Sequence, residues 1–228
     1  MKGLTIIIPA LNEENTIRQN FPKWVPQLRQ KPVQLIMVDG GSSDQTVLCA
    51  ETFGFELIES SRTGRSIQMN EGARKAKYDR LFFLHADAQP PLNLWAQLQN
   101  FEASGLDFGL FPYEFEPSNI WLTINAKQTF KKGPFTGGGD QGLWIKKQVF
   151  HEVGCFDENL PIMEDFDLFW RLKEKYRYDL ASTPLKVSSR KYQSNSYLKV
   201  QLVNLYVFLA FRFGQDPKLL EKRYKKWL

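Results

Sequence analysis

The sequence predicts an α/β fold built on an open, mostly parallel β-sheet flanked by helices. Residues 4–10 and 33–41 are continuous apolar runs rich in Ile and Val, a pattern typical of strands that are buried on both faces. Polar residues that favour helix starts follow each run. This alternation of strand and helix over roughly the first hundred residues indicates a doubly wound sheet.

The first half of the chain contains two further strands of this kind. Residues 55–60 and 80–86 repeat the apolar pattern, and stretches with helical periodicity separate them. The first helix starts after Asn12, and we expect it to end early because Pro22 and Pro26 interrupt it.

The second half is predicted to contain mixed elements. Residues 107–116 alternate like a strand with one solvated face, and residues 118–130 have helical periodicity. A glycine-rich loop then leads into a strand at residues 143–147. A short helix is expected over residues 148–154, and residues 164–175 form a strongly amphipathic helix.

The composition is that of an ordinary globular protein and excludes several functional classes. The net charge is only +5, and no nucleic-acid-binding module accompanies it, so we expect no nucleic-acid partner. Cys49 and Cys155 have no metal-ligand spacing, which predicts reduced thiols in a cytoplasmic protein. The apolar run near the N-terminus is too short for a signal peptide and fits a first strand.

One segment, residues 197–213, has the composition to contact a membrane or a second copy of the chain. It is apolar but short for crossing a bilayer, and four polar residues interrupt it, namely Lys199, Gln201, Asn204 and Arg212. Two interpretations stay open: a buried or dimer-forming helix, and a helix that lies in the plane of the membrane interface as a peripheral contact.

Acidic and amide side chains follow three of the predicted strands. They are Asn12 with Glu13 and Glu14, Asp39, and Asp87. Taken singly, each has an ordinary explanation as a turn or helix cap. In open α/β sheets, however, ligands bind at the carboxyl ends of the strands, so their coincidence at one edge predicts a binding site.

Five segments carry a resemblance to a known family. In order along the chain they are IIIPALNEENTI, VDGGSSDQT, GRSIQMNEGARKA, FFLHADAQPP and MEDFDLFWRLK. As a set they resemble the family 2 glycosyltransferases with the GT-A fold, over residues 4–175. The LHAD and GDQG variants are most similar to a bacterial subgroup labelled arsenosugar-biosynthesis glycosyltransferases.

The resemblance implies one glycosyltransferase domain over residues 1–228. Within it we expect a nucleotide-binding half at residues 1–100 and a mixed acceptor-side half at residues 101–195. A helical, basic segment completes the chain at residues 196–228. The implied reaction is an inverting, metal-dependent transfer of a sugar from a nucleotide sugar to an acceptor hydroxyl, whose identity the sequence does not reveal.

The resemblance assigns nucleotide-sugar-binding roles at the first strand ends. The residues that match the family segment beside the base and ribose are Pro9, Ala10, Asn12 and Glu13. Asp39 matches the aspartate that binds the base edge, and a carboxylate is a natural acceptor for an imide N–H, which favours a UDP-sugar. We interpret Ser42, Ser43 and Asp44 as the cap of the next helix.

Residues 64–73 line the donor site in the family that the chain resembles. They lack the lysine-serine ending of a P-loop and do not match the G-x-G-x-x-G spacing. We therefore take Arg65 as a candidate diphosphate contact and Asn70 as a second one. A plain surface role is the alternative for Arg65.

His85, Ala86 and Asp87 lie where the family keeps its D-x-D metal motif. A nucleotide sugar leaves a diphosphate, and a Mn²⁺ or Mg²⁺ ion neutralises its developing charge. Asp87 keeps the position of the direct ligand, and Ala86 lies beside the donor. His85 replaces the first aspartate. It is a candidate ligand that suits Mn²⁺ better than Mg²⁺, or alternatively a strand-end histidine bonded to backbone.

Glu164 and Asp165 match the acidic pair of the family near the acceptor. An inverting transfer needs a base for the acceptor hydroxyl, and Asp165 is our candidate, with Glu164 as its orienting neighbour. The alternative is that both acids only favour the helix N-terminus electrostatically. Further contacts on the sugar or acceptor side are expected from Gly139, Asp140, Gln141 and Arg190.

Two other functional classes stay open at this point. A sugar-phosphate nucleotidyltransferase also uses a nucleotide-binding α/β sheet, but it would need a G-x-G-T-R loop where this chain has PALNEEN. A non-catalytic nucleotide-sugar-binding module would have lost activity with the first motif aspartate. The presence of Asp87 and Asp165 argues against such a module.

Overall fold

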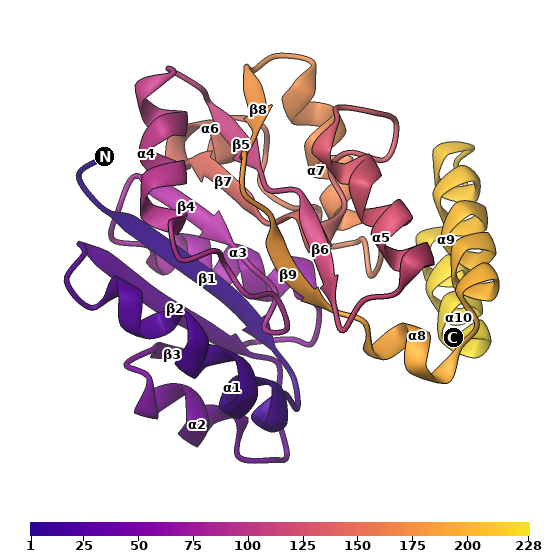
Figure 1. Cartoon of the computed structure of the whole chain (residues 1–228), viewed down its shortest axis with the longest axis horizontal. Helices are drawn as coiled ribbons and strands as arrows, with labels where there is room; N and C mark the ends of the chain where they lie inside the picture. Colours follow the sequence, from indigo (N-terminus) through magenta and orange to yellow (C-terminus); the bar gives the residue numbers. More distant parts are fainter.

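A computed structural model describes all residues from 1 to 228. Its main sheet has seven strands in the order β3-β2-β1-β4-β7-β5-β8. The first four strands are parallel and lie at one side of the molecule in Figure 1. They are β1 (Leu4–Ala10), β2 (Val33–Asp39), β3 (Glu56–Glu59) and β4 (Arg80–Phe83). The predicted parallel sheet is therefore confirmed for the first half.

The second half extends the same sheet but reverses one strand. Strand β7 (Leu143–Lys146) is antiparallel to both β4 and β5 (Phe108–Leu110), and β5 pairs in parallel with β8 (Tyr178–Leu180). A separate two-stranded parallel sheet joins β6 (Tyr113–Glu116) to β9 (Leu185–Ser188).

The single strand predicted over residues 107–116 is wrong. The chain forms β5 and β6 instead, and the two strands belong to different sheets. Between them lies Pro112, which has no N–H to donate to a sheet, and Phe111 is fully buried. The alternation of apolar residues in the sequence therefore spans two strands rather than one.

Ten α-helices complete the fold. The five in the first half of the order are α1 (Glu14–Asn20), α2 (Thr46–Thr52), α3 (Arg65–Lys75), α4 (Leu94–Ala103) and α5 (Ile120–Lys127). The remaining five are α6 (Lys147–Glu152), α7 (Glu164–Lys173), α8 (Arg190–Ser194), α9 (Tyr197–Arg212) and α10 (Pro217–Trp227). As predicted, the first helix ends early, and two 3-10 turns begin with Pro22 and Pro26 near their starts.

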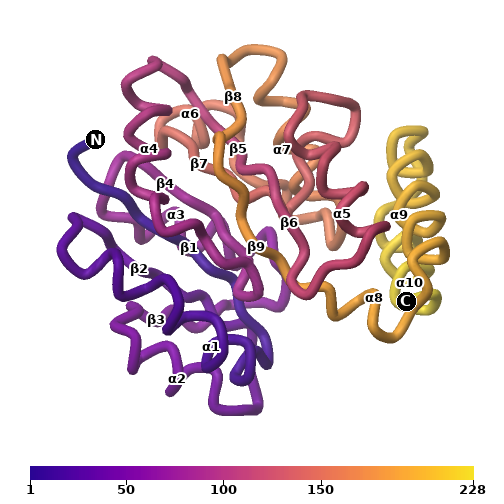
Figure 2. The backbone as a smooth tube through the Cα atoms, viewed as in Figure 1, coloured from indigo at the N-terminus to yellow at the C-terminus, as the bar shows by residue number.

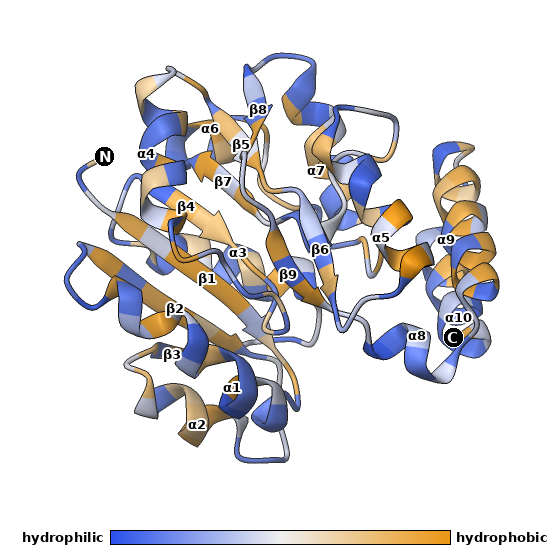
Figure 3. Ribbon diagram, viewed as in Figure 1, coloured by the Kyte–Doolittle hydropathy of each residue, from blue (hydrophilic) through white to orange (hydrophobic).

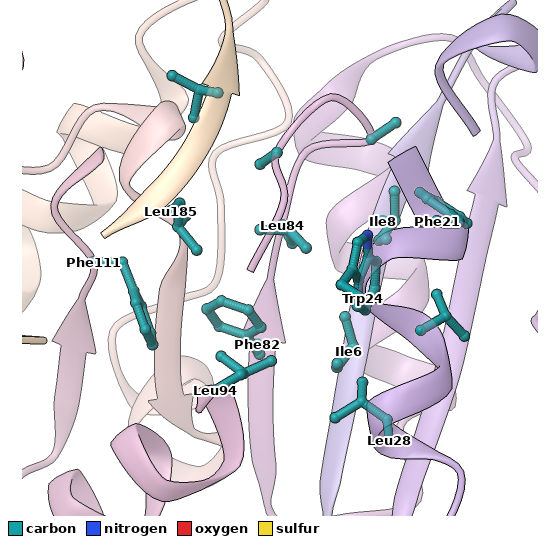
Figure 4. Packing of buried hydrophobic residues seen from close by; sticks show 14 of the residues in the cluster. Ile6, Ile8, Phe21, Trp24, Leu28, Phe82, Leu84, Leu94, Phe111 and Leu185 are labelled. Atoms are coloured by element: carbon teal, nitrogen blue, oxygen red, sulfur yellow. The ribbon is translucent and has the colours of Figure 1, made fainter. Parts of the chain in front are cut away.

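The core has two parts, one on each face of the main sheet. Successive side chains of a strand point to opposite faces, so Ile6 and Ile8 of β1 belong to one cluster and Ile7 to the other. Figure 4 shows Ile6 and Ile8 against Trp24. The orange colour of β1, β2 and β4 in Figure 3 marks this continuous apolar character, which is why both faces must be covered.

Helices α9 and α10 form a hairpin at the edge of the molecule opposite β3, as Figure 2 shows. None of the helices has both the length and the apolar character that crossing a membrane requires. One side of α9 is buried, at Val200, Val203, Val207 and Ala210, while leucines on another side are exposed. The expected helix over residues 197–213 is thus present and only partly buried.

Candidate active site

The loops after β1 and β2 are held together by hydrogen bonds. Asp39, at the end of β2, accepts the backbone N–H groups of Gly41 (3.0 Å) and Ser42 (2.9 Å) and also the Ser42 hydroxyl. Asn12 has a left-handed backbone (φ 54°), and its side-chain oxygen accepts the Ser43 N–H at 2.8 Å. These bonds fix the backbone at the predicted nucleotide end of the sheet.

The interpretation of residues 42–44 as a helix cap holds for Asp44 and is wrong for the two serines. Helix α2 begins at Thr46, and Asp44 Oδ1 accepts the Thr46 N–H at 3.0 Å and also the Thr46 hydroxyl. Ser42 and Ser43 bond across to the β1 loop instead. The Ser42 hydroxyl accepts the Asn12 N–H at 2.9 Å, so this serine satisfies a backbone group of the β1 loop and not one of the helix.

Gln68 is a structural residue of the site that the motifs do not identify. Its side-chain amide is buried on α3 and donates to the backbone oxygens of Ala10 (2.9 Å) and Val38 (2.8 Å). It thereby joins the carboxyl ends of β1 and β2 below the loops. Helical spacing could have located it, because Gln68 shares a face of α3 with Gly72, which packs on Ile7.

The two residues predicted from α3 as diphosphate contacts differ in their surroundings. Arg65 begins the helix, and its Nε lies 3.4 Å from a carboxylate oxygen of Glu164. Asn70 is buried, donates to Phe156 O (2.9 Å) and accepts from Phe156 N (3.1 Å). Asn70 therefore anchors the loop around Phe156, and both polar atoms of its side chain are occupied. We do not retain it as a candidate contact to the diphosphate of the nucleotide sugar.

His85 and Asp87 follow β4 at the same edge of the sheet. Asn20 holds this turn by donating to the backbone oxygens of Ala86 (3.0 Å) and Ala88 (2.9 Å). Burial, together with the charge of Arg65, lowers the pKa of His85 to about 4, against the opposing effect of Asp140. The imidazole is therefore neutral near pH 7, and its Nδ1 lies 3.9 Å from an Asp140 carboxylate oxygen.

In the unliganded protein, the surroundings of Asp87 disfavour the ionised form of its carboxyl group. Burial raises its pKa to about 6, and the negative charges of Asp140 and Glu13 act in the same direction. Arg190 opposes this shift, with a guanidinium nitrogen 3.6 Å from the Asp87 carboxylate. A cation placed here would remove the electrostatic penalty.

Glu164 and Asp165 begin α7 directly after Met163, which has a left-handed backbone (φ 70°). Glu164 is only 2% exposed, and one of its carboxylate oxygens has no hydrogen-bond partner, although Arg65 provides an ion pair. Burial, followed by the charge of Glu164, raises the pKa of Asp165 well above its usual range. These acids are therefore not satisfied by the protein in the way that Asp39 is.

Gly139 is the point at which Asp165 and His85 meet. A Cβ atom at position 139 would lie 2.3 Å from a carboxylate oxygen of Asp165 and 2.6 Å from Cε1 of His85. Only glycine allows both side chains to approach this loop. The structure thus brings together three residues that are separated in the sequence, one each from the β4 end, the glycine loop and α7.

The other two residues predicted from the glycine loop lie in different environments. Asp140 is mostly exposed and faces His85. Gln141 is buried, and its side-chain oxygen accepts the Gly137 N–H at 2.7 Å while its backbone oxygen accepts the Phe111 N–H at 2.7 Å. Gln141 therefore shapes the loop from beneath, and Asp140 is the member that is open to a ligand.

Arg190, at the start of α8, reaches across the carboxyl ends of β1 and β4. Its guanidinium lies 3.4 Å from a Glu13 carboxylate oxygen, 3.6 Å from Asp87 and 3.1 Å from the Thr16 hydroxyl. The neighbouring Lys191 points elsewhere and donates to the Tyr224 hydroxyl at 2.5 Å. Of the two basic residues, Arg190 is the one placed among the strand-end acids.

The side chains at Asp87 and His85 could provide one or two ligands to a metal ion whose remaining ligands come from water and a phosphate group. No group of three or more His, Cys, Asp or Glu side chains is arranged to hold an ion by itself. Mg²⁺ commonly takes only one or two carboxylates from a protein and completes its shell with water and substrate phosphate. A single half-buried carboxylate of raised pKa, two positions after a neutral imidazole, fits this requirement.

Comparison with known proteins identifies the family. The family described as "Glycosyl transferase family 2" matches residues 5–156, which is more than half of the chain. The chain belongs to glycosyl transferase family 2. A related family, described as "Glycosyltransferase like family 2", matches residues 118–212.

Two curated relatives extend this finding. An uncharacterized glycosyltransferase of Rickettsia bellii is 28% identical over 189 residues, covering 74% of this chain and 27% of the relative. A 4,4'-diaponeurosporenoate glycosyltransferase of Staphylococcus aureus is 34% identical over 92 residues, covering 38% of this chain and 24% of the relative. The family 2 chain therefore spans about a quarter of the length of these relatives.

Solved structures confirm the GT-A fold. Residues 1–349 of S. aureus TarS, in complex with UDP-GlcNAc, superpose with a TM-score of 0.67 at 13% identity, covering 100% of this chain and 71% of that one. The mannosyltransferase PcManGT of Pyrobaculum calidifontis, in complex with GDP-Man and Mn²⁺, gives 0.66 at 17% identity, covering 94% and 66%. The arsenosugar subgroup label finds no support in these comparisons and stays a prediction.

Proposed function

We propose that this chain transfers a sugar from a UDP-sugar to an acceptor hydroxyl, with inversion at the anomeric carbon. The observation that carries the proposal is the meeting of Asp165, His85 and Gly139 at the carboxyl edge of the sheet, where Asp87 also follows β4. Ligands of open α/β sheets bind at this edge. Membership of family 2 and solved neighbours that hold nucleotide sugars support the same reaction.

Asp165 is the proposed general base. Its raised pKa matches the task, because a base works best when its pKa lies nearer the working pH than that of an ordinary aspartate. A donor diphosphate would lie toward Asp87, and the acceptor hydroxyl would lie on the opposite side of the sugar, near Asp165. Glu164 orients this end of α7 through its ion pair with Arg65.

Arg65 and Arg190 are the proposed diphosphate contacts. Each guanidinium now lies against acidic side chains, Arg65 against Glu164 and Arg190 against Glu13 and Asp87. The distances of 3.4 to 3.6 Å are longer than good charge-assisted hydrogen bonds. Both groups therefore keep donors that a diphosphate could take.

Asp87 is the proposed protein ligand for Mn²⁺ or Mg²⁺, with His85 beside it. When bound, the ion supplies positive charge that stabilises the departing nucleotide diphosphate. A glucosyl-3-phosphoglycerate synthase of Mycobacterium tuberculosis, solved with Mn²⁺, UDP-glucose and phosphoglyceric acid, superposes with a TM-score of 0.63 at 17% identity, covering 93% of this chain and 80% of that one. It supports the choice of a divalent cation.

The assignment of uridine rests on Asp39. Its carboxylate already accepts three hydrogen bonds from residues 41 and 42, but two carboxylate oxygens offer about four acceptor sites, which leaves one for an imide N–H. We identify no residue of the chain that would specify the transferred sugar or the acceptor in the same way.

Titration of UDP by calorimetry, with and without Mn²⁺, tests the proposal directly. We expect binding that is at least about tenfold tighter with the metal, and loss of this difference in Asp87→Ala. Glu51→Ala, which removes an exposed acid on α2, is the matched control and should behave like the wild type. Absence of UDP binding under both conditions would refute the proposal.

A screen of nucleotide sugars for metal-dependent hydrolysis then identifies the donor without knowledge of the acceptor. Slow release of UDP from one sugar donor supports transfer chemistry. Binding without any hydrolysis in the presence of diverse acceptors would favour the non-catalytic module instead.

A further inference from the structure

Helix α9 carries a stripe of exposed apolar side chains on its outer side. We call it the leucine stripe, and its members with their exposed fractions are Leu198 (66%), Leu202 (58%), Leu205 (42%), Leu209 (43%) and Phe213 (83%). Their spacing of three or four positions places them on one side of the helix. Contiguous apolar surface of this kind marks an interaction site on a globular protein.

The other sides of α9 are already occupied. Phe208 lies against Phe135 and Trp170, with ring centroids 5.0 and 5.8 Å apart, and Phe211 stacks on Trp170 at 5.9 Å. These contacts fix the helix to α7. The leucine stripe is therefore a surface feature of a firmly packed hairpin. A rotation of α9 that buried the leucines would expose Phe208 and Phe211 instead.

The charge of the chain is concentrated in the same segment. Residues 196–228 contain seven of the 30 Lys and Arg residues but only two of the 25 Asp and Glu residues. This segment alone carries a net charge of +5, so the preceding 195 residues are neutral overall. Apolar surface and positive charge thus occur together on the α9–α10 hairpin.

Helix α10 carries most of this charge on the same hairpin as the leucine stripe. It runs back along α9, with Trp227 against Tyr206 at 5.2 Å between ring centroids, and Arg223 donates to the Tyr206 hydroxyl. Leu219, Lys222 and Lys226 follow a spacing of three and four positions and share an exposed side of α10, next to Arg223. The exposed surface of the hairpin therefore includes apolar side chains of α9 and basic side chains of α10.

We propose that the α9–α10 hairpin binds the surface of an anionic lipid bilayer through the leucine stripe and these basic side chains. Such a surface supplies both hydrocarbon for the leucine stripe and negative charge for the lysines. A second copy of the chain would bring two segments of +5 together, and this repulsion disfavours a homodimer through the same face. The inference depends only on residues 196–228 and not on the proposed transfer reaction.

Vesicle sedimentation of the full chain, without nucleotide, tests the inference. We expect binding to vesicles of phosphatidylcholine with about 30% phosphatidylglycerol, and at least about tenfold weaker binding to pure phosphatidylcholine. Raising the salt from about 0.1 M to about 0.5 M should weaken binding several-fold, because the lysine contribution is screened. Failure to bind the anionic vesicles at low salt would overturn the proposal.

Two sets of variants separate the apolar and electrostatic contributions. Leu202→Glu with Leu205→Glu should reduce vesicle binding at least about tenfold, and Lys222→Ser with Lys226→Ser should reduce it about three- to tenfold and lessen its salt dependence. Leu48→Glu, at an exposed leucine of α2, is the matched control and should bind as the wild type does. Equal losses in the control would contradict a specific face.

Light scattering of the same proteins tests whether a second copy of the chain, rather than a bilayer, covers the leucine stripe. We expect a monomer for both the wild type and the Leu202→Glu, Leu205→Glu variant. A wild-type dimer that this variant converts to monomer would overturn the proposal and assign the leucine stripe to a second copy. Thermal melts of each variant that match the wild type ensure that a loss of binding reflects the changed surface.

Discussion

Asp39 and Asp165 both lie at the edge of the fold where we propose that the nucleotide sugar binds, yet their surroundings differ. Asp39 accepts three hydrogen bonds from the loop that follows it, within the half built from regular parallel strands. Asp165 lies in the mixed half, where burial and the charge of Glu164 raise its pKa. The neighbouring Glu164 has a buried oxygen without a hydrogen bond.

The difference indicates that acidic residues near one site can have two roles, stabilising a loop or interacting with a ligand. A carboxylate that accepts hydrogen bonds from the backbone and a hydroxyl of the following loop, as Asp39 does, stabilises that loop. Carboxylates that are buried and electrostatically unfavourable cost stability, and such costs gather where a ligand is bound or a proton is moved. The following substitutions would sharpen this contrast or break it.

Asp165→Asn should have the largest effect. Loss of the base is expected to lower kcat by about 10³-fold or more while UDP affinity stays within about threefold. Asp167→Asn is the matched control, because it removes an acid two positions along α7 that is paired with Arg171 rather than facing Gly139. Single-turnover kinetics and UDP calorimetry provide the two measurements, and a variant that retains turnover would exclude Asp165 as the base.

Gly139→Ala should follow in size. The added methyl group would press on the Asp165 carboxylate and the His85 ring, so we expect about a 10²-fold loss of kcat from their misplacement. Gly133→Ala is a suitable control, since a Cβ atom there meets nothing within 4 Å. If both variants kept full activity, the close approach at position 139 would have no catalytic importance.

Asp39→Ala should act on stability. The loop would lose three hydrogen bonds to one carboxylate, and we expect the free energy of unfolding to fall by about 2–3 kcal/mol in urea titrations. The exposed Glu51→Ala change should cost less than about 0.5 kcal/mol. A similarly small effect at position 39 would show that the three hydrogen bonds to Asp39 contribute little to the stability of the fold.

Asp87→Asn should have the smallest effect and the opposite sign. In the unliganded protein the pKa of Asp87 is about 6, above its unfolded value, so ionisation of this group destabilises the fold. The stabilising contribution of the protonated acid is complete below about pH 4 and is lost as the pH rises through about 6.

The asparagine variant should therefore be more stable than the wild type by about 1–2 kcal/mol at pH 8, and this advantage should vanish near pH 4. Thermal melts across this range, without metal or nucleotide, provide the measurement. A variant that is less stable than the wild type at pH 8 would show that Asp87 is satisfied in the same manner as Asp39.

Much of the fold could be predicted because it depends on local patterns. Strands such as Leu4–Ala10 are buried on both faces, so an uninterrupted apolar run identifies them. The acids at strand ends were visible for a similar reason. The division of residues 107–116 between two sheets was not, because pairing partners such as Leu185 lie far along the chain.

The site was harder to predict wherever one side chain has two plausible partners. Asn70 and Gln141 lie in segments that match donor-site or loop motifs, yet their amide groups satisfy buried backbone of residues 156 and 137. Gln68 and Asn20 do the same for the strand ends and belong to no recognisable pattern. Such roles depend on which backbone groups tertiary packing leaves unpaired.

The contact between Arg190 and Glu13 has a consequence for the order in which the protein matures. These residues are 177 positions apart, and β9, which leads to Arg190, pairs with β6. Because a ribosome delivers the chain from its N-terminus, the four parallel strands are synthesised well before Arg190 emerges. The carboxyl edge of the sheet therefore acquires its Arg190 contact only after much more of the chain has been made.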